Sequence, residues 1–166
     1  MPVKKFTLFK GMYSLEWWEG VKTWEKIVNI QLVPGSKIIS AILRGIARTD
    51  NWFVGIQIRV NGVTKFKYEW STSGGETEIN VDIIDVIQEG TNYFHLDIWK
   101  TIWYPRRIDV YVEVYLELEI SGEVIIVEQK NIIKYVIVGV LTAPIVIGLI
   151  AGLVEKFRRR KKKKEK

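Results

Sequence analysis

Apolar and polar residues alternate along most of the chain with a period of two. The clearest case is the stretch 109–120, in which an apolar residue occupies every second position and the residues between are acidic or tyrosine. Such alternation predicts a strand in a sheet that has one buried face and one face in water. Shorter stretches of the same kind precede it, and none has the 3.6-residue period of a long helix.

A tight turn joins two of these stretches within residues 51–70. The pair Asn61-Gly62 lies between two alternating runs, and it readily takes the positive φ angles that a two-residue hairpin turn requires. We therefore predict a β-hairpin centred on this pair.

Other turn residues divide the remaining stretches. Pro34-Gly35 ends the strands expected within residues 6–32, and residues 37–47 are expected to form the next strand, with a short helix as the alternative. The polar residues 71–77, with the flexible pair Gly74-Gly75, are expected to form a loop. Strand-like patterns resume over 78–87 and 93–103, and they end at the turn residues 89–92 and at Tyr104-Pro105.

The pattern changes near the C-terminus. Residues 135–154 are twenty residues without a charged side chain, and a helix of that length spans the hydrocarbon core of a bilayer, which is about 30 Å thick. We predict a transmembrane helix here. Its ends, its glycines and its proline are Tyr135, Gly139, Pro144, Gly148, Gly152 and Val154. Pro144 indicates a kink, and the spacing of Gly148 and Gly152 would let a second helix approach closely.

These patterns predict an all-β protein, an antiparallel β-sandwich or jelly roll, followed by one C-terminal transmembrane helix. The expected parts are a sandwich domain at 1–122, a juxtamembrane connector at 123–134, the membrane helix at 135–154 and a tail at 155–166. Within the connector, residues 124–127 form either a final strand or the first apolar residues at the membrane interface. The length suits one domain with a substantial core.

The basic charge of the chain belongs to the tail. Residues 1–154 carry 16 basic and 17 acidic side chains, whereas residues 155–166 carry 9 and 2, so the formal charges are −1 and +7. The cations expected to contact anionic lipid or, where they face a genome, nucleic acid are Lys156, Arg158, Arg159, Arg160, Lys161, Lys162, Lys163 and Lys164. The body itself is almost neutral, so its charge does not indicate nucleic-acid binding.

The orientation in the membrane is ambiguous from sequence. A basic tail is expected on the cytoplasmic side or inside a particle, yet residues 1–18 lack the apolar core and cleavage site of a secretory signal peptide. The basic tail predicts a body outside the cell, whereas a C-terminal anchor without a signal peptide usually leaves the body in the cytoplasm. We expect a single-pass protein located in a virion membrane or a cell envelope. The internal membrane of a virion would remove the conflict between the two predictions.

No set of residues predicts catalysis, a metal site or a cofactor. The acidic row Asp109, Glu113, Glu117 and Glu119 is expected to be a solvated strand face that meets basic residues such as Arg59, Lys65 or Lys67 on a neighbouring strand. His95 is the sole histidine and the chain has no cysteine, so a metal site or a catalytic triad would lack its usual partners. We expect a protein that is not an enzyme.

Seven tryptophans are an excess for this length, and they are Trp17, Trp18, Trp24, Trp52, Trp70, Trp99 and Trp103. They fit a core or an interface with protein or lipid, and they also fit a platform for sugar rings. Trp17 and Trp18 are the most informative pair, because adjacent strand residues face opposite sides and both cannot enter one core. One of them is expected to meet a partner, a neighbouring loop or lipid.

Residues 36–120 resemble the jelly-roll modules called galactose-binding-like. The matching residues are Val60, Asn61 and Gly62 in the hairpin, followed by Val81, Asp82, Asp85, Gly90 and Asn92, with Ile84 where that group commonly has threonine. The resemblance implies a fold rather than an activity. The residues suit turns, with Asp82 and Asp85 as local caps and Gly90 and Asn92 at unusual φ angles.

The overall organisation also resembles, more loosely, the membrane-associated capsid proteins of archaeal icosahedral viruses that have an internal lipid layer. That likeness implies a membrane-anchored shell protein whose jelly-roll body contacts its own copies or other shell proteins. The alternative is a cell-surface module that binds carbohydrate or protein from a single-pass anchor.

Overall fold

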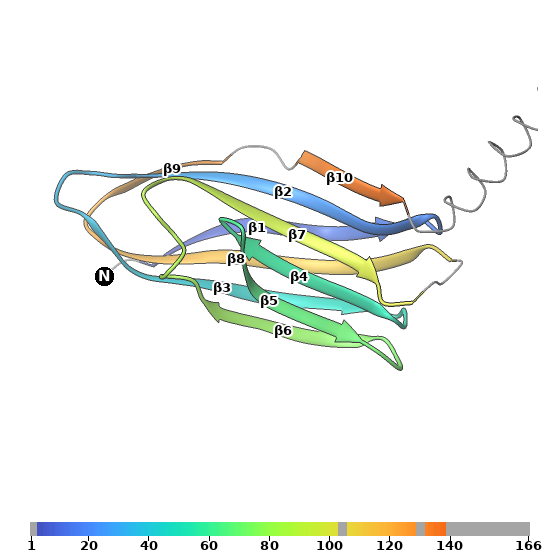
Figure 1. Ribbon diagram of the computed structural model, residues 1–166. Coiled ribbons are helices and arrows are strands. Elements are labelled where there is room, and N and C mark those ends of the chain that lie inside the picture. Colours follow the sequence, from blue (N-terminus) through green and yellow to red (C-terminus); the bar gives the residue numbers. More distant parts are fainter. Residues whose placement is uncertain (1–2, 103–105, 129–131, 139–166) are drawn as a thin grey trace, which may run out of the picture.

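Two antiparallel sheets pack face to face in the structure, a computed structural model that describes residues 3–102, 106–128 and 132–138. One sheet has four strands in the order β1-β8-β3-β6, and the other has six, with the order β10-β2-β7-β4-β5 and β9 also paired to β2. The strands are β1 (Val3–Leu15), β2 (Glu19–Leu32), β3 (Lys37–Thr49), β4 (Val54–Val60), β5 (Val63–Trp70), β6 (Gly75–Asp82), β7 (Gly90–Lys100), β8 (Ile108–Ser121), β9 (Val124–Glu128) and β10 (Ile132–Val138). Figure 1 shows the two layers.

The pairing of the first eight strands is nested. β4 pairs with β5, β3 with β6, β2 with β7 and β1 with β8, all antiparallel. The strands thus follow the order of one long hairpin centred on the β4–β5 turn. Its successive pairs alternate between the six-stranded and the four-stranded sheet. That arrangement is a jelly roll, which confirms the all-β sandwich predicted from the alternation.

The core lies between the sheets and is made by the alternating positions. Every apolar residue predicted for the inner face of β8 is buried, namely Val110, Val112, Val114, Leu116, Leu118 and Ile120. Phe94, Leu96 and Ile98 of β7 face them from the other sheet and are fully buried. Aromatic rings also bridge the layers, since Tyr13 of β1 meets Trp24 of β2 edge to face with ring centroids 5.0 Å apart.

The predicted hairpin is confirmed. Asn61 and Gly62 join β4 to β5 with φ angles of 50° and 87°, the left-handed values that a tight hairpin turn demands. The predicted strand at 37–47 is β3, which continues to Thr49.

The first strand is longer than the short stretches expected within residues 6–17. Its register against β8 shifts between Thr7 and Phe9, and the adjacent residues Leu8 and Phe9 are both buried. A β-bulge inserts one residue and so moves the inward positions from even to odd numbers. The alternation therefore breaks in the sequence although the strand does not.

Two boundaries differ from expectation near β6. The expected loop at 71–77 ends at Gly74, because Gly75–Asp82 pairs with β3. The strand-like pattern at 78–87 stops at Asp82. The amides of Val86 and Ile87 donate to the carbonyl of Ile83, so residues 83–87 form a compact turn from which Ile83 and Ile87 are buried in the core.

The chain remains in the sandwich beyond residue 122, where the connector was expected to begin. The alternative of a final strand at 124–127 is the one observed, since β9 pairs with the C-terminal half of β2. β10 then pairs with the N-terminal half of the same strand. The two strands cover one edge of β2 from Leu32 to Glu19, as Figure 1 shows.

The first residues of the predicted membrane helix overlap with β10. Residues 135–138 belong to β10, where the β2 edge supplies backbone hydrogen-bond partners and β-branched residues favour a strand. A continuous apolar run has no period, so the sequence alone cannot locate the change of structure within it. Among the described residues there is no helix long and apolar enough to cross a bilayer, and residues 139–154 lie outside them.

The register places the described loops at the two ends of the sandwich. Val138 lies opposite Glu19, Leu15 opposite Ile108 and Val54 opposite Lys100. We call this end, where β10 finishes, the Val138 end; its described loop residues are 16–18, 50–53, 71–74, 101–102 and 106–107. The opposite end carries the turns at 33–36, 61–62, 83–89 and 122–123.

Candidate functional site

Large apolar side chains are exposed in the loops of the Val138 end. Trp17, Trp18 and Trp52 expose 53%, 44% and 54% of their surface, and Ile102 is also exposed. Trp17 and Trp18 contact each other edge to face with ring centroids 5.4 Å apart. They lie in the turn between β1 and β2 and not on a strand as the sequence suggested, so both point outward instead of facing opposite sides of a sheet.

The turn that carries Trp17 and Trp18 is held by hydrogen bonds. The Lys100 ammonium, at the end of β7, donates to the carbonyls of Glu16 and Trp17 at 2.9 and 3.1 Å. Glu19 accepts a hydrogen bond from the Glu16 amide at 2.8 Å through its carboxylate, and its own amide donates to the Glu16 carbonyl. Burial lowers the pKa of Lys100 from its ordinary value despite the nearby carboxylates. The turn that carries the two rings is thus held by hydrogen bonds to the end of β7 and to the start of β2.

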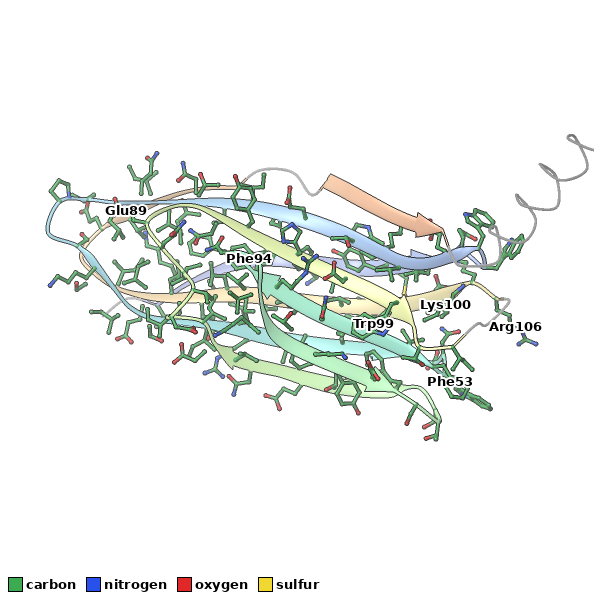
Figure 2. All side chains as sticks on the ribbon, viewed as in Figure 1. Phe53, Glu89, Phe94, Trp99, Lys100 and Arg106 are labelled. Atoms are coloured by element: carbon green, nitrogen blue, oxygen red, sulfur yellow. The ribbon has the colours of Figure 1, made fainter. Side chains whose placement is uncertain are left out.

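The loop that carries Trp52 is also fixed. Thr49 donates from its hydroxyl to the carbonyl of Asp109 at 2.7 Å, and the amide of Asn51 donates to the Thr49 hydroxyl at 3.1 Å. The Thr101 amide donates to the carbonyl of Phe53 at 2.8 Å. Phe53 has a φ of 56°, which is uncommon for an aromatic residue and turns the chain back into β4. Figure 2 shows Phe53, Lys100 and Arg106 at this end and Glu89 at the other.

The remaining described tryptophans have other environments. Trp24 and Trp70 are buried in the core. The Trp99 indole lies over Gly55 on the outer face of the six-stranded sheet, in a position that a Cβ at residue 55 would occupy. The Lys67 ammonium lies 5.4 Å from its ring centroid. Trp103 is outside the described residues.

A charged network occupies the outer face of the six-stranded sheet. Asp97 of β7 is only 3% exposed, and its carboxylate accepts two hydrogen bonds from Arg59, at 2.7 and 2.9 Å. Gln57 and Thr23 donate to the same carboxylate at 2.8 and 2.6 Å. Burial alone would raise the pKa of Asp97, but the hydrogen bonds from Arg59, Thr23 and Gln57 outweigh it and hold the pKa below its usual value.

His95 lies beside this network on β7. Its Nε2 is 2.8 Å from a carboxylate oxygen of Glu25 on β2, the residue directly opposite it in the register. No group of three or more His, Cys, Asp or Glu side chains suited to a metal ion occurs in the described part of the chain. The arrangement is a cross-strand pair within a sheet.

The acidic row of β8 lies on the outer face of the four-stranded sheet, as the alternation predicted, but its partners differ. Arg59, Lys65 and Lys67 are in the other sheet, and β8 instead lies between β1 and β3. Glu113 accepts hydrogen bonds from Lys10 and Tyr111, each at 2.8 Å, and from Tyr115. Glu117 forms an ion pair with Arg44 at 2.7 Å, and Asp109 accepts a hydrogen bond from Arg107 at 2.9 Å. Glu119 lies opposite Val3 and Ser40 in the register.

The electrostatic environment of this acidic row fits a structural role better than a catalytic one. The hydrogen bond from Lys10 holds the pKa of Glu113 below its usual value, so the carboxylate stays ionised at neutral pH. A general acid would need the opposite shift. The row therefore forms a compensated surface, with cations on both flanks of an acidic strand.

Two of the asparagines that carry the sequence resemblance, Asn61 and Asn92, are joined by a hydrogen bond at the opposite end. Asn92 is fully buried; its side-chain oxygen accepts from Gln88 and Asn61, and its nitrogen donates to the carbonyls of Gln88 and Gly90. Asn61 in turn donates to the carbonyl of Val86 at 2.7 Å. Gly90 has the expected positive φ, at 93°, whereas Asn92 is not among the residues with one. Its role is hydrogen bonding.

The two aspartates of that resemblance have different roles. Asp82 accepts a hydrogen bond from the amide of Ile84 at 2.9 Å, which is the turn cap expected from the sequence. Asp85 pairs instead with Lys65 of β5, at 2.6 Å.

Sequence reasoning missed the Asp97 network and the rigid supports of the tryptophan loops. Asp97 and Thr23 are 74 positions apart, and only the pairing of β2 with β7 brings them together. Trp17 and Trp18 were singled out, and the structure exposes both. The residues proposed to span the membrane from Gly139 onward, and the basic tail, lie outside the described residues.

Comparisons with known proteins do not assign this chain to a family. No protein-family model matches it, and no curated protein matches it. A search of solved structures finds a chain in "Structure of infectious bursal disease virus Gx strain" at 12% sequence identity and a TM-score of 0.42. The match covers 83% of this chain and 37% of that chain, so this chain spans well under half of its length. A likeness of this size supports no inference about function.

Proposed function

We propose that this protein is a membrane-anchored structural protein, a shell or membrane-associated capsid component of a virion. Its jelly-roll body would make lateral contacts, and residues 139–154 with the basic tail would hold it on the lipid. The observation that carries the proposal is the course of β9 and β10, which pair in turn with the C-terminal and the N-terminal half of β2 and bring the chain to Val138. The proposal includes no catalytic step and no cofactor.

This course gives the body a fixed orientation. Val138, the last described residue, belongs to a paired strand, and Gly139, the first residue of the remaining apolar run, follows it directly in the sequence. A flexible stalk would let a body tilt and rotate freely. A body carried on a paired strand presents the same faces to its neighbours in every copy, which lateral packing requires and a free-standing receptor does not.

The length of the remaining apolar run also matters. Residues 139–154 are sixteen residues, and as a helix they would extend about 24 Å, which is less than the usual hydrocarbon thickness. A short span is accommodated by local thinning of the bilayer and by long cationic side chains that reach back to the headgroups. Lys156 and Arg158 would serve that purpose, and the body would be drawn close to the lipid.

The outer faces of the two sheets suit polar lateral contacts. The four-stranded sheet presents the compensated row on β8 with its cations on β1 and β3. The six-stranded sheet presents Trp99, Lys67 and the Asp97 network. Interfaces between proteins commonly combine aromatic residues and arginine with satisfied polar groups.

The proposal is tested on the full chain in a mild detergent and in phosphatidylcholine vesicles. We expect the chain to float with vesicles in a density gradient, and to form regular assemblies of many copies when detergent is removed. Protease treatment of sealed vesicles should leave the apolar run protected. A chain that stays in the aqueous fractions, or that remains monomeric at high density in the bilayer, would contradict the proposal.

The exposed tryptophans favour a second candidate, a cell-surface module that binds carbohydrate or protein. The rings of Trp17 and Trp18 stand at 88° to each other, so they offer two separate stacking faces and no shared flat platform. A glycan array probed with the detergent-solubilised chain distinguishes the candidates. Retention of one defined glycan by a monomer would favour the binding module.

A further inference from the structure

Among the described residues, the three most exposed tryptophans lie at one end of the sandwich. Trp17, Trp18 and Trp52 come from two loops that are distant in sequence, and both loops lie at the Val138 end. The other exposed apolar residues among those described lie on the strands, such as Met12 on β1 and Tyr93 on β7, or in loops of either end, such as Ile84 and Ile102, and none of them is tryptophan.

The same end is where the chain continues into its apolar run. Val138 pairs with Glu19, which directly follows Trp18, so the last residue of β10 lies at the level of the tryptophan turn. Figure 1 shows β10 ending beside the β1–β2 turn. With no linker before residue 139, the loops at this level would lie within the headgroup region, which is about 5–8 Å thick in each leaflet.

Tryptophan is the residue that this region favours. Its ring is large and apolar and carries one N–H donor, so it is enriched where hydrocarbon meets water. The charges around the rings are of both signs, with Lys100 and Arg107 near Glu16 and Asp109, so this end has no strong electrostatic preference for anionic lipid. Rigid loops add to the effect, because little conformational freedom is lost on contact.

We propose that the Val138 end is a lipid-contacting surface, on which Trp17, Trp18 and Trp52 lie in the headgroup layer of the leaflet that faces the body. This inference rests on the proposed membrane anchoring and specifies how the body is seated. Contact of the three rings with the headgroups sets the height of the sandwich above the bilayer and its tilt relative to the bilayer. The apolar run attaches the chain to the membrane.

The absence of cysteine from the whole sequence makes the test direct. A single cysteine is introduced in the full chain as Asp50→Cys or Thr101→Cys at the Val138 end, or as Ile84→Cys at the opposite end, and each is an exposed position. A spin label is attached and the chain is reconstituted in phosphatidylcholine vesicles. Collision with oxygen, which enters lipid, is compared with collision with a water-soluble nickel chelate.

We expect the labels at 50 and 101 to be severalfold less accessible to nickel, relative to oxygen, than the label at 84. Changing Trp17, Trp18 and Trp52 together to glutamine should raise nickel accessibility at 101 towards the value at 84. Changing Met12 and Tyr93 to glutamine, as a control that removes exposed apolar surface elsewhere, should leave it unchanged. Unfolding in urea checks that each variant is folded.

The outcomes separate the two proposals. If the full chain does not float with vesicles, the membrane anchoring itself is wrong. If it floats but the labels at 50 and 101 are as accessible to nickel as the label at 84, the seating is wrong and the anchoring stands. Labels at 50 and 101 shielded from both oxygen and nickel would assign the surface to a second protein copy and would also overturn the lipid contact.

Discussion

At the scale of single residues, the most constrained group is Asp97. Its carboxylate is buried on a sheet face that should be wet, and it is tolerable there because Arg59, Gln57 and Thr23 supply donors to both oxygens. Removing one member of such a set leaves the others buried without a partner, which costs more than the set contributes as a whole.

We expect Asp97→Asn to lower the free energy of unfolding by about 2–3 kcal/mol at neutral pH, since the charged acceptor for Arg59 is lost. The pKa of Asp97 is depressed in the folded state, so its stabilisation is present above the unfolded pKa of about 3.9 and is lost as pH falls through the folded value. Below about pH 4, the stability of the variant should therefore depend less steeply on pH.

Urea unfolding followed by tryptophan fluorescence, from pH 2 to pH 7, measures both effects. Glu69→Gln is the matched control, because Glu69 pairs with Lys67 in an exposed position on β5 and should change stability by less than about 1 kcal/mol. A variant at Asp97 that retained the acid dependence of the wild type would show that other carboxylates dominate it.

A second residue-scale constraint is the close approach of β3 to β8 at Gly45. A Cβ there would overlap the backbone carbonyl of Glu113. We expect Gly45→Ala to destabilise the chain by about 1–3 kcal/mol, because a paired backbone must shift. Gly75→Ala on β6 is the control, since its Cβ would be at least 3.8 Å from Trp70. Equal midpoints of urea unfolding for the two variants would contradict the expected crowding.

At the scale of elements, the second half of the loop between β6 and β7 is held by the side chain of Asn92. Asn92 holds the backbone of residues 88–90 and meets Asn61 of the β4–β5 turn. The two turns therefore behave as one unit at the end opposite to Val138.

We expect Asn92→Ala to cost about 2 kcal/mol, because several buried polar groups lose their partner. Hydrogen exchange at the Gln88 amide should also become faster than in the wild type. Thr91→Ala, on the exposed neighbour, should alter neither quantity. Unchanged protection of Gln88 in the Asn92 variant would mean that the loop is ordered by its apolar residues alone.

The edge of β2 is the second element-scale feature. β10 pairs with it from Glu19 to Glu25, and an unpaired edge of that length is a site for association with other chains. We expect a chain ending at Glu128 to be less stable and to associate with increasing concentration, whereas one ending at Val138 should stay monomeric in sedimentation. Identical sedimentation of the two chains would argue against a protective role of β10.

Local patterns predicted the elements that depend on local information. The alternation of β8 and the Asn61-Gly62 turn are properties of contiguous residues, and both are observed. The bulge at Thr7, the partners of Glu113 and the surroundings of Asp97 depend on which strands lie side by side. The end of β10 was missed because an apolar run satisfies a strand edge and a bilayer equally well.

At the scale of the whole molecule, rigidity between body and anchor is the property that distinguishes the proposed shell protein from a receptor. We expect that ten Gly and Ser residues inserted between Val138 and Gly139 would leave folding and flotation with vesicles unchanged. Such a linker spans about 17 Å on average, so the body would lose its fixed orientation and regular assemblies should no longer form. Assemblies that persist would show that orientation comes from lateral contacts alone.

The pairing of β10 with β2 also has a mechanical consequence. Hydrogen bonds between antiparallel strands run perpendicular to the strands, so a pull directed along β10 from Val138 loads the bonds to β2 in shear, all at the same time. A pull across the strand would instead open them one by one. β10 runs towards the end at which the chain continues. Tension from a bending membrane would therefore pull along β10, the direction in which its pairing with β2 resists force most strongly.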